Sequence, residues 1–179
     1  MFSIAGIKAA IFHMIGHAVS KLSLFFATGI LESKYGGTNI INLIGLVKKS
    51  KGLALLFTVA ILSMIGIPPL AGFVGKAYIL YAAINDKVDY IVVAILTISI
   101  LISASYFIRL IYNMYFAVNK SISLKVSKEE KYSEGAMKIA TILSCCCILC
   151  YVFSFPFLMK FLDKIQFKDL AEILKEGVQ

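Results

Sequence analysis

The first long apolar stretch of the chain reads AAIFHMIGHAVSKLSLFFATG and runs from Ala9 to Gly29. A helix needs about 20 mainly apolar residues to cross the hydrocarbon of a bilayer, and this stretch has that length. Three basic side chains interrupt it at intervals of four residues: His13, His17 and Lys21. Because an α-helix turns once in about 3.6 residues, these three groups share one face. The stretch therefore predicts a membrane helix that carries a line of basic groups.

A second apolar run, from about residue 53 to about residue 83, contains the sequence SMIGIPPLAGFVGK from Ser63 to Lys76. The residues that interrupt it are Gly66, Pro68, Pro69, Gly72 and Gly75. Proline has no backbone N–H and glycine loosens the chain, so we expect this helix to break in the middle. Lipid cannot satisfy the freed backbone groups, so such a break must face protein or a water-filled cavity, and transporters use breaks of this kind for ion sites. Lys76 follows the predicted break.

Composition and run length together predict the fold class. Hydrophobic residues make up 60% of the 179 residues, whereas an average soluble domain has about 45–50%. Four runs are long enough to span a membrane: residues 6–31, 53–83, 90–112 and 137–159. We therefore expect an all-α integral membrane bundle of four transmembrane helices, the second discontinuous, within residues 1–159. The tail, residues 160–179, alternates charged with apolar residues and predicts a short interfacial helix.

The net charge of +8 comes from lysines that lie mainly between the apolar runs. The first loop contains Lys34, Lys48, Lys49 and Lys51, and the third contains Lys120, Lys125, Lys128, Lys131 and Lys138. The positive-inside rule then places both loops on the cytoplasmic side of the inner membrane and both termini outside. We expect no nucleic-acid partner, because there is no Arg-rich or aromatic-interleaved basic patch. No cleavable signal peptide is expected, because Lys8 and Lys21 fall within the first run.

The basic residues inside the spans are the candidates for chemistry. Histidine takes up and releases protons near neutral pH, and a lysine removed from water gives up its proton more readily. A row of such groups bridged by water can relay protons. The structural alternative is that the histidines bond to neighbouring helices and Lys21 extends to the membrane surface. Lys21 lies roughly 15 Å from the nearer end of its run, which is too deep for that, so the relay interpretation is favoured.

The same comparison applies to Lys76. A proline kink could have a packing role alone, but such a kink does not require a lysine beyond it, and we favour a functional one. No acidic residue falls within a span, so these buried cations call for partners elsewhere.

Two other sets of residues are assigned structural roles. Arg109 is expected to be an interface anchor at its helix end. The cysteines are expected to be packing residues rather than metal ligands, because no second ligand pair accompanies them: Cys145, Cys146, Cys147 and Cys150. Ser99, Ser103 and Ser105 could hydrate a path, but helix packing explains them as well. We expect no metal and no cofactor in this chain.

The two segments Ala9–Gly29 and Ser63–Lys76 resemble the histidine-lysine helix and the broken helix of a known family. These are the antiporter-like proton-translocating subunits shared by respiratory complex I, membrane-bound hydrogenases and Mrp-type sodium/proton antiporters. Members have about fourteen helices with two inverted repeats, and this chain resembles the last four. The resemblance implies that His13, His17 and Lys21 correspond to the second-half relay. It also implies that Lys76 is the terminal basic residue, where some members have glutamate.

The resemblance further implies a split subunit, a separately encoded half or a truncated relative. The expected function is proton or sodium translocation within a larger redox-driven or antiporter complex, as a subunit without a redox centre of its own. Its expected partners are other membrane subunits, including a chain that supplies the missing first repeat or a neighbouring antiporter-like subunit. The alternative is a non-conducting structural or assembly subunit of the same kind of complex.

Overall fold

The structure is a computed structural model and describes residues 4–35, 39–85, 90–117 and 131–164. Within these ranges the chain forms helices and no strand, which confirms the all-α class. The helices are α1 (Ile4–Tyr35), α2 (Ile40–Leu43), α3 (Leu46–Lys49), α4 (Lys51–Ile65), α5 (Ala71–Asn85), α6 (Tyr90–Tyr115), α7 (Lys131–Phe153) and α8 (Phe155–Lys164).

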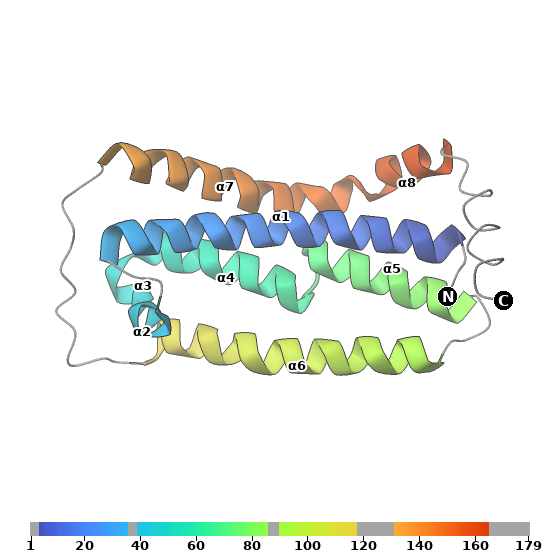
Figure 1. Cartoon of the computed structure of the whole chain (residues 1–179), viewed down its shortest axis with the longest axis horizontal. Coiled ribbons are helices and arrows are strands. Elements are labelled where there is room, and N and C mark those ends of the chain that lie inside the picture. The colour runs from blue at the N-terminus through green and yellow to red at the C-terminus, as the bar shows by residue number, and fades with distance from the viewer. Residues whose placement is uncertain (1–3, 36–38, 86–89, 118–130, 165–179) are drawn as a thin grey trace.

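Helix α1 is the centre of the bundle. It packs against α7 on one side and against α4 and α5 on the other, and α6 packs against the far side of α4 and α5 (Figure 1). Small residues let α1 and α7 approach closely, since Gly16 faces the ring of Tyr151 and Gly29 faces Met137. The Tyr151 hydroxyl donates a 2.6 Å hydrogen bond to the carbonyl of Phe12 and so fixes α7 on α1.

Within the described residues, three helices are long and apolar enough to cross a membrane: α1, α6 and residues Gly135–Phe153 of α7. Helices α4 and α5 have 15 residues each and follow one another along α1 (Figure 1). No residue in the most apolar window of α6 is buried. Its apolar outer face is therefore available to lipid or to another protein.

The chain leaves the helical path between Ile65 and Ala71 because of its backbone chemistry. Gly66 ends α4 with φ of 92°, a left-handed conformation that glycine adopts without strain. Pro68 and Pro69 follow, joined by a cis peptide bond, and neither has an N–H to continue a helix.

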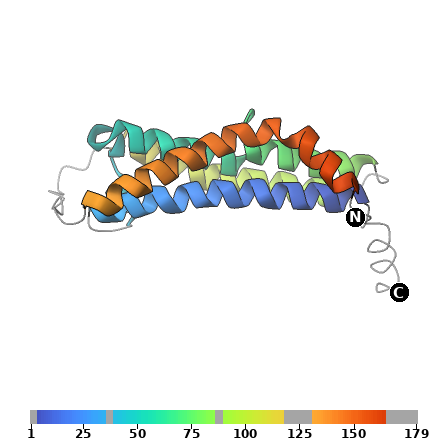
Figure 2. The same ribbon diagram turned by 90° about the horizontal axis from the view of Figure 1, so that it is seen from above.

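The end of the last apolar run differs from the expectation of a helix over residues 137–159. Helix α7 ends at Phe153, and α8 begins at Phe155 and runs in a different direction (Figure 2). Pro156 explains this, because it has no N–H to bond the carbonyl one turn earlier and its ring would clash there. The tail helix expected over residues 160–179 is described only as far as Lys164, and the remainder lies outside the described residues.

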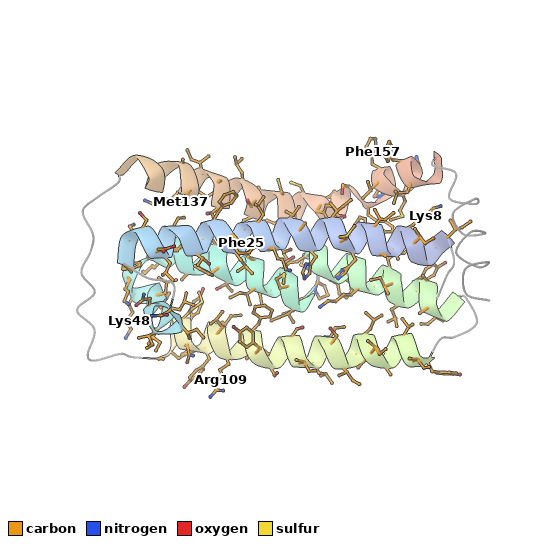
Figure 3. All side chains as sticks on the ribbon, in the orientation of Figure 1. Lys8, Phe25, Lys48, Arg109, Met137 and Phe157 are labelled. Carbon is orange, nitrogen blue, oxygen red and sulfur yellow. The ribbon has the colours of Figure 1, made fainter. Side chains whose placement is uncertain are left out.

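Basic residues gather at one end of the bundle, where α1 ends, α2 and α3 lie, and α7 begins. Figure 3 shows Lys48 at this end and Lys8 at the opposite end. The lysines at the first end whose side chains are described are Lys34, Lys48, Lys49, Lys51 and Lys138. The helix ends that flank the first and third loops thus lie together. Lys131 begins α7 at this end, and Lys120, Lys125 and Lys128 lie outside the described residues.

Candidate functional site

Lys76 lies in the second turn of α5 and turns back across the helix break. Its ammonium donates hydrogen bonds to the carbonyls of Met64, at 3.1 Å, and Ile65, at 2.8 Å. These carbonyls end α4 and have no partner within that helix, and the end of a helix is the negative end of its dipole. The half-buried Lys76 therefore closes the end that the break exposes. An ammonium has three protons, so one N–H remains for another acceptor.

The two histidines of α1 face the same break. Their ring centroids are 5.7 Å apart. Helix α5 crosses α1 at Gly75, where His13 packs against the glycine. The Nδ1 atom of His13 is buried and has no hydrogen-bond partner among the described residues. A buried nitrogen without a partner is costly, so a water molecule would find a favourable place there.

The basic groups of the two segments interact electrostatically with each other. Lys76 acts on both His13 and His17, and Lys21 acts on His17. The structure therefore brings His13, His17 and Lys76 together across the break. In the described part of the chain, every charged side chain that acts on the two histidines is basic. Since like charges repel, a proton on one of these groups opposes a proton on the next.

Lys21 is placed differently from the other three. It is exposed on the outer face of α1, on the same stripe as the exposed side chains of Met14 (66%) and Phe25 (72%). The other helices of this chain thus do not bury Lys21. Its surroundings depend on what covers this face of α1.

A cavity of about 440 Å³ opens beside Lys76, between α5 and α6. Its walls are mainly apolar, and the side chains of Lys76, Tyr81 and Thr97 carry the polar groups. The apolar lining residues include Phe73, Leu80, Ile84, Leu96 and Ile100. Lys76 therefore has space beside it that water or another protein segment can fill.

Two buried serines at the break did not stand out in the sequence. Ser20 of α1 and Ser63 of α4 lie 2.7 Å apart, oxygen to oxygen, and Ser63 accepts a hydrogen bond from the backbone N–H of Gly72. Both serines fall inside the two segments that also contain the histidines and the break. Their place inside these two segments was the only sequence signal for the serines, but nothing in the sequence showed that Ser20 and Ser63 contact each other.

The remaining candidates lie away from the break. Arg109 is exposed and points away from the bundle (Figure 3), as expected for an anchor. Ser103 and Ser105 bond to carbonyls of their own helix, α6. Cys145 contacts Ser23 at 3.0 Å, whereas Cys146, Cys147 and Cys150 are exposed on α7.

Comparison with known proteins gives a consistent set of relatives. Residues 1–103 match the family described as NADH:quinone oxidoreductase/Mrp antiporter, TM. The chain is 41% identical over 105 residues to NADH-quinone oxidoreductase subunit N 2 of Herpetosiphon aurantiacus, covering 59% of this chain and 19% of that protein. It is 32% identical over 139 residues to the putative antiporter subunit mnhD2 of Staphylococcus aureus, covering 78% of this chain and 28% of that protein.

The chain therefore spans less than a third of the length of either relative. Among solved structures, respiratory complex I from Thermus thermophilus with bound aureothin contains a similar chain. The two are 18% identical, and the superposition covers 85% of this chain and 43% of the other with a TM-score of 0.46.

Proposed function

The chain belongs to the NADH:quinone oxidoreductase/Mrp antiporter transmembrane family, and from that membership we propose that it is an ion-translocating subunit of a larger membrane complex. The ion is H⁺ or Na⁺, and the complex is redox-driven or an antiporter. The observation on which this depends most is Lys76, which closes a broken helix and interacts with His13 and His17. A titratable cation at this position can couple the gain or loss of a proton to the conformation of the break.

In the proposed mechanism, repulsion between charged basic groups drives protons from one group to the next. A proton that arrives at His17 or His13 opposes the charge on Lys76 across the short distance between α1 and α5. Lys76 can release its proton into the adjoining cavity, and the carbonyls of Met64 and Ile65 favour the charged form when a proton returns. Lys21 continues the line on α1 towards a partner that covers its exposed face.

The proposal includes a topology. Helices α4 and α5 together form one discontinuous span, so that α1, α4 with α5, α6 and α7 make four spans. The basic end of the bundle faces the cytoplasm across the inner membrane, and both termini face outside. Other membrane subunits cover the exposed faces of α1 and α6, and one of them supplies a first repeat or is an adjacent antiporter-like subunit.

One observation favours a second candidate function, a structural or assembly subunit that conducts no ion. The two hydrogen bonds of Lys76 are sufficient to explain a lysine at this place, because they satisfy the last carbonyls of α4. The structural and conducting roles differ in one property of the side chain. A helix cap needs a donor and a positive charge, whereas a relay needs a proton that leaves.

Two substitutions separate these roles. Lys76→Met removes the ammonium, whereas Lys76→Arg keeps the charge and the donors but rarely releases a proton. We expect both to slow transport roughly tenfold or more, the scale at which loss of a proton-transfer group is felt. The measurement is H⁺ and Na⁺ flux, followed separately in membrane vesicles that contain equal amounts of the assembled complex.

The two variants act as controls for each other. Normal flux in Lys76→Arg together with impaired flux in Lys76→Met would favour the structural role. Normal flux in both would remove Lys76 from the pathway.

A further inference from the structure

A chain of hydrogen bonds crosses the helix break and joins three helices. The backbone N–H of Gly72 in α5 donates to Ser63 Oγ in α4 at 3.3 Å. Ser63 Oγ lies 2.7 Å from Ser20 Oγ in α1, and Ser20 donates to the carbonyl of Gly16 at 2.9 Å. Ser20 is 1% exposed and Ser63 is 0% exposed, so water does not compete for these bonds.

The direction of the chain follows from counting protons. A serine hydroxyl has one proton to donate, and Ser20 uses its proton on the carbonyl of Gly16. Ser20 then has no proton left for Ser63, so Ser63 donates to Ser20 while it accepts from Gly72. The chain begins at a peptide N–H and ends at a peptide carbonyl, and neither group exchanges protons during transport. The chain is therefore a mechanical link rather than a proton path.

The link holds the first turn of α5, which also carries the lysine. An N–H in the first turn has no partner in its own helix, so the bond from Gly72 to Ser63 replaces the missing one. Lys76 comes one turn later, on the segment that this bond orients. The same segment is in tight contact with α1, since an added Cβ at Gly75 would lie 2.6 Å from Nδ1 of His13.

We propose that Ser63, acting together with Ser20, is a positioning residue for Lys76. Ser63 fixes the start of α5 against α4 and α1, so that Lys76 reaches the carbonyls of α4 and acts electrostatically on the histidines of α1. This inference rests on the proposed ion translocation through Lys76. It adds a role for two serines that do not themselves take up or release protons.

The experiment compares Ser63→Ala, Ser20→Ala, their double variant and Ser23→Ala, with Lys76→Met as the reference for lost transport. Ser23 is the matched control, because it is equally buried in α1 and its hydroxyl contacts Cys145 in α7, away from the break. Flux is measured in vesicles with equal amounts of assembled complex, over a range of pH.

We expect Ser63→Ala to slow flux roughly threefold to tenfold, the scale of one buried hydrogen bond, and to change the pH at which flux is half-maximal. Ser23→Ala should change neither. The double variant should be no slower than Ser63→Ala, because both serines act through the same link.

Three outcomes overturn the proposal. A normal rate and pH profile in Ser63→Ala, where Lys76→Met abolishes flux, would reject the positioning role and leave the proposed function intact. Equal losses in Ser63→Ala and Ser23→Ala would indicate general packing damage instead. Normal flux in Lys76→Met would reject the proposed function and this inference with it.

Discussion

At the scale of single residues, the lack of a side chain at Gly75 sets the distance between α1 and α5. A Cβ at this position would lie 2.6 Å from Nδ1 and 2.9 Å from Cα of His13. The second of these atoms belongs to the backbone of α1 and cannot move aside alone. Glycine at this position is therefore what allows His13 and Lys76 to interact across the helix contact.

Gly75→Ala is expected to separate α5 from α1 and to destabilise the bundle by about 1–3 kcal/mol, the usual cost of overpacking. Flux should fall together with stability, because the distance between Lys76 and His13 increases. Thermal unfolding of the purified complex and vesicle flux test this. The matched control is Gly52→Ala in α4, where an added Cβ meets nothing within 4 Å. Equal unfolding temperatures for the two variants would show that the contact at residue 75 is less tight than the structure indicates.

At the scale of elements, the helix break places Lys76 of α5 beside the open end of α4. Helix α4 ends at Gly66, and Lys76 of α5 returns to the carbonyls that α4 leaves open. A continuous helix would have bonded those carbonyls to its own backbone and left Lys76 without them. The break thus creates the environment of the lysine.

Gly66→Ala tests the break through its backbone. Its φ of 92° is strained for any residue with a Cβ, at a cost of about 1–2 kcal/mol. The added Cβ would also lie 3.1 Å from Cδ of Lys76. We expect a lower flux per assembled complex, because the lysine loses its place on α4.

Gly45→Ala is the control for strain alone. Gly45 has φ of 66° at the start of α3, far from Lys76 in the sequence and at the basic end of the bundle. A similar loss of stability is expected there, with normal flux per assembled complex. Equal flux losses in both variants, measured in the same vesicles, would mean that the break has no special role.

At the scale of the whole molecule, the distribution of lysines predicts orientation. The described lysines of the first and third loops lie at one end of the bundle, and Lys8 and Lys160 lie at the other. Cytoplasmic ends of membrane proteins are enriched in lysine and arginine. The clustered end is therefore expected to face the cytoplasm.

Labelling with a membrane-impermeant thiol reagent tests this orientation in intact cells. The exposed residues Lys48 and Lys160 are each replaced by cysteine in a chain whose own four cysteines are alanine. Lys160→Cys should react from outside, whereas Lys48→Cys should react only after the membrane is permeabilised. The reverse pattern would invert the proposed topology, and flux in the alanine background serves as the control for folding.

Much of this fold could be predicted from the sequence because the relevant signals are local. The length of the apolar runs predicts helices that cross a membrane. Gly66 with Pro68 and Pro69 predicts the break, since φ and the missing N–H groups belong to those residues alone. Four-residue spacing predicts that His13 and His17 share a face. Pro156, which explains the end of α7, was also a local signal, but the continuous apolar pattern around it favoured a single helix.

The rest depended on contacts between segments that are distant in the sequence. Ser20 and Ser63 are 43 positions apart, and their bond exists because α4 and α5 both pack on α1. The exposure of Lys21 was likewise decided by which face of α1 the other helices cover. Backbone preferences act within a few residues, so the sequence by itself determined the helices and the break between them. The packing of helices against one another decided which polar side chains meet.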